Sequence, residues 1–193
     1  MTLLQYTFAI LLLLCTPGPT NTLMALGGFS RGWAGALPLV AGELGGYLTV
    51  IVPVTTVAAP FFTAYPQASL IAKAAACIWV LWLSYGLWNA EKKSGRGVEI
   101  SLRQVFLTTL LNPKALIIAL VIMPRGAPLE LLPWLGLFAG LVILAANGWI
   151  LFGRMLGRTE RFAIKPVLMR RVAAACLLVF AMILTTTSIQ SLA

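Results

Sequence analysis

Two charged side chains, Glu43 and Lys114, lie inside long apolar runs of the sequence. Charged residues at membrane depth are costly, and they commonly mark a substrate or proton pathway. Glu43 therefore predicts a proton-coupling group or a seat for a substrate ammonium, because a carboxyl group can carry a proton or face a cation. Lys114 predicts a partner for a substrate carboxylate or for a freed backbone carbonyl. The alternative is an ion pair between the two residues that only fixes helix packing.

Three asparagines accompany these charges: Asn21, Asn112 and Asn147. An amide side chain both donates and accepts hydrogen bonds, so the three suit a zwitterionic substrate as a set. Hydrogen bonding between helices is an equally good interpretation, because polar side chains commonly join helices in membranes.

The composition indicates a membrane protein. Of the 193 residues, 60% are apolar and 10% are charged, whereas soluble domains average roughly 45 to 50% apolar and about 25% charged residues. The sequence has no His and no Asp, which removes the usual zinc ligands and any Ser-His-Asp triad. We therefore expect no enzyme activity, metal site or cofactor. The net charge of +9 resides in basic residues between the apolar runs, which favours membrane orientation over nucleic-acid binding.

Six apolar runs are each long enough to cross the hydrocarbon core as a helix. Continuous apolar runs without period-two alternation favour helices over a barrel. We predict an all-α integral membrane fold, with residues 1–193 as a single transmembrane domain. The predicted spans are 3–26, 34–57, 68–89, 104–123, 131–152 and 170–190.

The connectors between these spans predict the orientation, because Lys and Arg concentrate on the cytoplasmic side. The first, third and fifth connectors hold 11 of the 14 basic residues. We therefore expect a multi-pass protein of the bacterial inner membrane with both termini outside. These 11 residues are Arg31, Lys92, Lys93, Arg96, Arg103, Arg154, Arg158, Arg161, Lys165, Arg170 and Arg171.

Prolines interrupt the first and fourth predicted spans. Pro17-Gly18-Pro19 breaks the first, and Asn112-Pro113-Lys114 breaks the fourth. Proline removes a backbone donor and frees carbonyls that lipid cannot satisfy, so such breaks face protein or a water-filled cavity. The paired positions predict two inverted three-helix repeats, at about 1–90 and 104–193, joined by a basic cytoplasmic connector at about 91–103, with the substrate site between the broken helices. Kinks that only shape packing are the alternative.

The remaining chemistry-bearing side chains have structural interpretations. Cys15, Cys77 and Cys176 lie in apolar runs without metal-ligand spacing, so we predict buried thiols. Six aromatic residues fall largely near span ends and predict interfacial anchors. They are Trp79, Trp82, Tyr85, Trp88, Trp134 and Trp149.

The stretch Thr16-Pro17-Gly18-Pro19-Thr20-Asn21-Thr22-Leu23, the glycines Gly32, Gly35 and Gly42, and the stretch Asn112-Pro113-Lys114-Ala115 resemble the LysE/RhtB translocator family over essentially the whole chain. This resemblance implies an inner-membrane exporter of amino acids and related small solutes in bacteria, driven by proton motive force or solute exchange. It also implies that six motif positions line the translocation pathway: Pro17, Gly18, Pro19, Asn112, Pro113 and Lys114.

We therefore predict a secondary exporter of amino acids or similar zwitterions, with Asn21 in the pathway and Glu43 as the proton-coupling group. A membrane thiol-disulfide carrier is an alternative suggested by Cys15 beside the first break, but the fourth span offers no second cysteine. A non-transporting scaffold would need no intramembrane charge, and an inorganic cation would find few ligands. The expected partners are the small substrate and the lipid bilayer. The glycine-rich second span leaves a homodimer open.

Overall fold

The computed structural model describes residues 2–58, 64–89, 100–124, 128–158 and 166–190, and every regular element in these ranges is helical. The predicted all-α fold is thereby confirmed for the described residues. The elements are α1 (Leu3–Cys15), α2 (Pro19–Ala36), α3 (Pro38–Pro53), the π-helical turn η1 (Val54–Ala58), α5 (Pro66–Trp88), α6 (Leu102–Leu110), α7 (Pro113–Ile117), the π-helical turn η3 (Ile118–Ile122), α8 (Pro128–Arg158) and α9 (Pro166–Gln190).

Between two and four of the described helices are candidate membrane spans. The continuous segments Pro38–Ala58 and Leu129–Gly157 are each long and apolar enough to cross a bilayer. The other two candidates are bent pairs, α1 with α2 and α6 with α7 and η3, if each pair counts as one span. The described part of the chain is therefore helical and contains helices that could cross a membrane, and six spans in two inverted repeats stay a prediction.

The predicted connector between the first two spans, residues 27–33, contains a break in the helix. The residues of α2 run from Pro19 to Ala36, but they form two helical segments joined across a kink at Gly32, whose φ of 72° is left-handed. Glycine lowers helix propensity by about 1 kcal/mol, and here tertiary packing overrides that preference. A Cβ on Gly28 would lie 2.0 Å from the carbonyl oxygen of Ile150, so this glycine lets α2 lie directly against α8.

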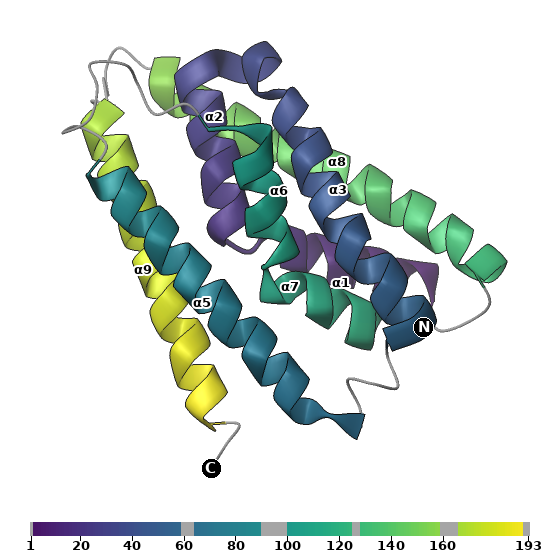
Figure 1. The fold of residues 1–193 in the computed structure, drawn as a ribbon. Helices are drawn as coiled ribbons and strands as arrows, with labels where there is room; N and C mark the ends of the chain where they lie inside the picture. Colours follow the sequence, from purple (N-terminus) through teal and green to yellow (C-terminus); the bar gives the residue numbers. More distant parts are fainter. Residues whose placement is uncertain (1, 59–63, 90–99, 125–127, 159–165, 191–193) are drawn as a thin grey trace.

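The helices associate in three main pairs. Helix α2 lies against α8, α3 against α6, and α5 against α9, with α5 and α9 side by side at one edge of the molecule (Figure 1). The buried apolar residues form two clusters, one containing Leu23, Leu83 and Leu177 and the other containing Tyr6 and Phe138. Helix α1 contributes to the second cluster and α2 to the first, so the break at residues 16–18 joins the two.

Glycine pairs bring two of these helix pairs into backbone contact. On α3, a Cβ on Gly42 would lie 2.7 Å from the carbonyl oxygen of Leu102, and one on Gly46 would lie 2.8 Å from that of Phe106. On α8, a Cβ on Gly153 would lie 1.8 Å from the carbonyl oxygen of Ala25, and one on Gly157 would lie 3.2 Å from that of Phe29. The two contacts share one pattern. In each, two glycines separated by four residues on one helix lie against two backbone carbonyls separated by four residues on the other helix.

Candidate functional site

The first break separates α1 from α2 and bends the chain by 64°. Helix α1 ends at Cys15, Thr16 and Gly18 are extended, and Pro19 begins α2. The last carbonyls of a helix have no partner within the helix, and Pro17 and Pro19 have no N–H group to offer. These carbonyls must therefore find donors elsewhere in the protein.

Side chains from three other places supply those donors. The Lys114 ammonium donates to the carbonyl oxygens of Leu13 and Thr16 at 2.9 and 2.5 Å. The Asn21 amide donates to those of Leu14 and Thr16 at 2.7 and 2.9 Å. The carbonyl oxygen of Leu14 also accepts from the Trp149 indole N–H at 3.2 Å. The first break is thus held by side chains from α7, α2 and α8.

The second break separates α6 from α7 and bends the chain by 50°. Pro113 begins α7, and Asn112 caps it because its side-chain oxygen accepts from the Lys114 backbone N–H at 3.1 Å. The Asn112 amide donates to the Thr20 hydroxyl at 3.2 Å, and that hydroxyl lies 3.2 Å from the Thr109 hydroxyl. This break is capped by its own residue and hydrogen-bonded to α2.

The two breaks form one buried cluster, because Lys114 lies at the second break and its side chain donates to backbone carbonyls of the first. Its side chain is only 6% exposed. A Cβ on Gly18 would lie 3.1 Å from the Lys114 nitrogen and 3.3 Å from its Cε. A glycine at position 18 therefore leaves the space that the ammonium occupies.

Glu43 is a second buried charge-bearing group near this cluster. Its side chain is 2% exposed, and its Oε2 atom has no hydrogen-bond partner among the described residues. Glu43 and Lys114, both described, form no ion pair within 4.0 Å, yet they lie close enough to interact electrostatically. The packing ion pair considered from the sequence is therefore not formed in this structure.

Helix periodicity places Glu43 on the buried face of α3. Leu39, one turn earlier, contacts α2 at Gly27, and Tyr47, one turn later, packs edge-on against Phe138 of α8. Residues four apart share one face of a helix. Glu43 therefore faces the interior between α2 and α8.

Other residues singled out from the sequence lie elsewhere. Asn147 accepts from the Trp33 indole and donates to its own helix at Ile143, so it does not join Asn21 and Asn112. The predicted burial of the thiols is wrong for Cys15 and Cys176, which are exposed, while Cys77 is half-buried. An apolar face of a membrane helix can turn towards lipid, so an apolar run does not imply burial within the protein.

Three residues of the cluster were not identified as site residues from the sequence. Thr20 and Thr109 had no assigned role, although their places next to Pro19 and three residues before Asn112 put polar groups beside both breaks. Trp149 was interpreted as an interfacial anchor, but its indole donates to the end of α1. No sequence pattern indicates which helix end an indole reaches.

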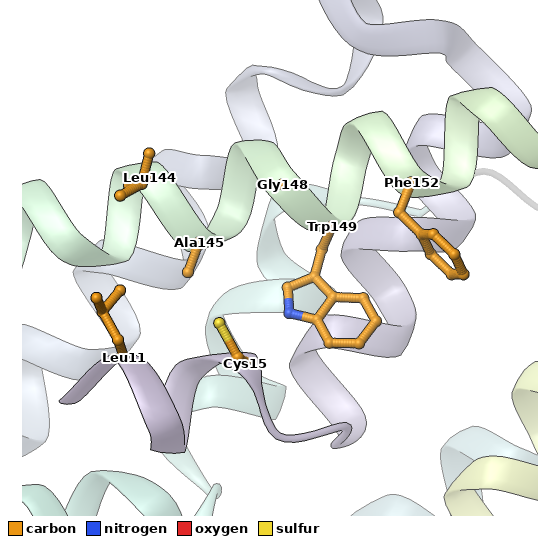
Figure 2. Close-up of a pocket in the computed structure, with 7 residues that line it drawn as sticks. All are labelled: Leu11, Cys15, Leu144, Ala145, Gly148, Trp149 and Phe152. Carbon is orange, nitrogen blue, oxygen red and sulfur yellow. The ribbon is translucent and has the colours of Figure 1, made fainter. Parts of the chain in front are cut away.

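Each break opens onto a pocket. The first-break pocket, of about 510 Å³, lies between α1 and α8 and is shown in Figure 2. The second-break pocket, of about 250 Å³, lies between α3 and the start of α7, with Val50, Pro53, Asn112 and Pro113 among its lining residues. The pockets and the cluster together give the described helices a polar centre with two apolar approaches.

Comparison with protein-family models, curated proteins and solved structures finds no match. Among the residues that the structure describes, no group of three or more His, Cys, Asp or Glu side chains could hold a metal ion. The chemistry available at the site is therefore that of one ammonium, one carboxyl group, two amides and the hydroxyls between them.

Proposed function

We propose that this chain is a secondary transporter of the LysE/RhtB type that exports amino acids or related small zwitterions across a bacterial inner membrane in exchange for protons. The observation that carries the proposal is the Lys114 ammonium, which starts at one helix break, donates to the carbonyls of the other, and lies near the buried Glu43. Discontinuous helices that meet inside a membrane protein commonly form the substrate site of a transporter.

The helix pairing supports two inverted repeats of three spans. Such symmetry exchanges spans 1 and 4, 2 and 5, and 3 and 6. This symmetry relates the contact between α2, in span 1, and α8, in span 5, to the contact between α6, in span 4, and α3, in span 2. The contact between α5, in span 3, and α9, in span 6, is related to itself. These two helices are antiparallel, because Ser84 donates to the carbonyl of Ala174 and Cys77 donates to that of Ala181. The two glycine contacts and the two break pockets are exchanged in the same way.

The separation of Lys114 and Glu43 suits a small zwitterion. The two groups interact electrostatically but are more than 4.0 Å apart, so each can take one end of a bound amino acid. The substrate carboxylate would compete with the carbonyls of Leu13 and Thr16 for the Lys114 ammonium. The substrate ammonium would face the Glu43 carboxylate and supply a partner for its Oε2 atom.

This arrangement couples the substrate to protons by competition. Only the ionised carboxylate attracts an ammonium, so a proton on Glu43 and a bound substrate exclude one another. A proton entering from outside would release the substrate there, and loss of that proton to the cytoplasm would prepare the site for the next substrate. Substrate binding also removes Lys114 from the first break, which frees the two broken helices to move relative to one another.

Efflux from proteoliposomes preloaded with a mixed amino-acid pool tests this proposal. We expect efflux that an inward proton gradient accelerates, and we expect Glu43→Gln to abolish this acceleration, because glutamine cannot exchange a proton. Glu130→Gln is the matched control, since Glu130 is an exposed acid on α8. Absence of efflux from well-inserted wild-type protein would overturn the transport proposal. Gradient-driven efflux unchanged in Glu43→Gln would overturn the coupling role alone.

A further inference from the structure

The first-break pocket has an apolar lining. Its walls are Leu11 and Cys15 from α1 and Leu144, Ala145, Gly148, Trp149 and Phe152 from α8. Figure 2 shows Leu11 and Cys15 directed from α1 towards the helix that carries Ala145 and Gly148. None of the lining residues that the structure describes is charged, and the indole N–H of Trp149 already donates to the Leu14 carbonyl.

One end of this pocket adjoins the polar cluster. Cys15 lines the pocket, and Lys114 donates to the carbonyls of Leu13 and Thr16, which lie on either side of Cys15 in the chain. The Leu14 carbonyl, which precedes Cys15, accepts from both Trp149 and Asn21. A molecule in the pocket therefore has the polar cluster beside one end and apolar walls along α8.

We infer that this pocket receives the side chain of the transported molecule, and that this side chain is apolar, as in leucine, methionine or phenylalanine. The inference rests on the proposed function and names its substrate class. A cationic or anionic side chain would lose its hydration here without finding an opposite charge in the lining. The volume of about 510 Å³ lies in the range of small-molecule sites, roughly 300 to 1,000 Å³.

A lipid acyl chain is the competing occupant of an apolar pocket in a membrane protein. An acyl chain carries no polar group to place beside Lys114 and Cys15, whereas an amino acid carries a carboxylate and an ammonium at the base of its side chain. The charge at the break thus favours the amino acid over lipid.

Gly148 provides the variant that fills the pocket. A Cβ at Gly148 would meet nothing within 4 Å, so a larger side chain there would occupy the pocket without striking the backbone. Gly140, also on α8, meets nothing within 4 Å and does not line the pocket. Gly148→Leu and Gly140→Leu are therefore a matched pair.

The experiment measures counterflow of leucine, methionine, phenylalanine, alanine, lysine and glutamate in proteoliposomes. For the wild type we expect leucine to be preferred over alanine by about 10- to 200-fold, the range of one methylene or more in an apolar pocket, and lysine and glutamate not to be carried. Gly148→Leu should lose the preference for leucine while still carrying alanine, and Gly140→Leu should behave as the wild type. Transport of lysine or glutamate as fast as leucine, or an unchanged preference in Gly148→Leu, would overturn the inference.

A binding measurement separates this inference from the transport proposal. Adding leucine should change the fluorescence of Trp149, even where no transport occurs. The part of the fluorescence signal that disappears in Trp149→Phe is the part due to Trp149. Leucine binding without transport of any amino acid would overturn the proposed function and leave the pocket assignment intact. Brominated acyl chains quench the fluorescence of a tryptophan that they contact. If they quench Trp149 and a saturating concentration of leucine does not reverse this quenching, lipid occupies the pocket and the inference is overturned.

Discussion

The two helix breaks differ in where the partners of their backbone groups come from. At the second break, Asn112 caps the helix that follows it, so the main hydrogen bond is local in sequence. At the first break, Asn21 is a local donor, but the carbonyls of Leu13 and Leu14 also accept from Lys114 and Trp149, which lie about a hundred or more residues away in the chain. The second break therefore has a fixed shape of its own, whereas the shape of the first depends on what the rest of the protein presents to it.

The largest expected effect follows from removing the Lys114 ammonium. In Lys114→Met, a side chain of similar length leaves the Leu13 carbonyl without its charged donor, and an unsatisfied buried group costs about 1 to 3 kcal/mol. We expect transport to be abolished and thermal stability to fall, as measured by efflux and by unfolding in detergent. Arg103→Met, at an exposed position on α6, is the control. Wild-type efflux in Lys114→Met would contradict the role of the ammonium at both breaks.

A smaller effect is expected for Gly18→Ala, at the first break. Its backbone is extended, so alanine is tolerated there, but the added Cβ would come within 3.1 Å of the Lys114 nitrogen. Displacing a positioned group by a fraction of an ångström or more lowers activity roughly 10- to 100-fold at most, and we expect a loss of efflux within that limit. Gly136→Ala, which meets nothing within 4 Å, should have no effect. Equal rates in the two variants would show that the ammonium is not tightly held.

The cap of the second break should contribute mainly to stability. Asn112→Ala removes the acceptor for the Lys114 backbone N–H, and loss of a helix cap costs about 1 kcal/mol. Asn112→Ser should restore part of this stability, because serine is also a good cap, although its contact with Thr20 would be lost. Thermal unfolding of the three proteins measures the difference. If serine were no better than alanine, the local cap would not be what stabilises this break.

The smallest effect is expected for the hydroxyl that connects the breaks. Thr20→Val keeps the shape of the side chain but removes the hydrogen bonds to Asn112 and Thr109, and such bonds between membrane helices average about 0.6 kcal/mol. We expect a slight loss of stability and efflux within about threefold of the wild type. A loss as large as that of Lys114→Met would mean that this hydroxyl, rather than the ammonium, holds the two breaks together.

Features set by local sequence could be predicted, and features set by distant contacts could not. Proline chemistry located both breaks, and the apolar runs located the helices to within a few residues except near α2. The helical path of α2 through Gly28 was not predicted, because it depends on a contact of this glycine with α8 that no local propensity records. The depth of Lys114 indicated a special role, but its acceptors on α1 lie in another part of the chain, and the exposure of Cys15 depends on which helices surround it.

The glycine contacts determine which helices can move as units. The contact through Gly153 joins α2, from the first broken span, to α8, and the contact through Gly42 joins α6, from the second broken span, to α3. Each close pair therefore combines helices from both halves of the sequence, and backbone contact leaves little room for either pair to separate. Any relative motion at the breaks would then take place between these mixed pairs, so the units that move would not coincide with the two halves of the sequence.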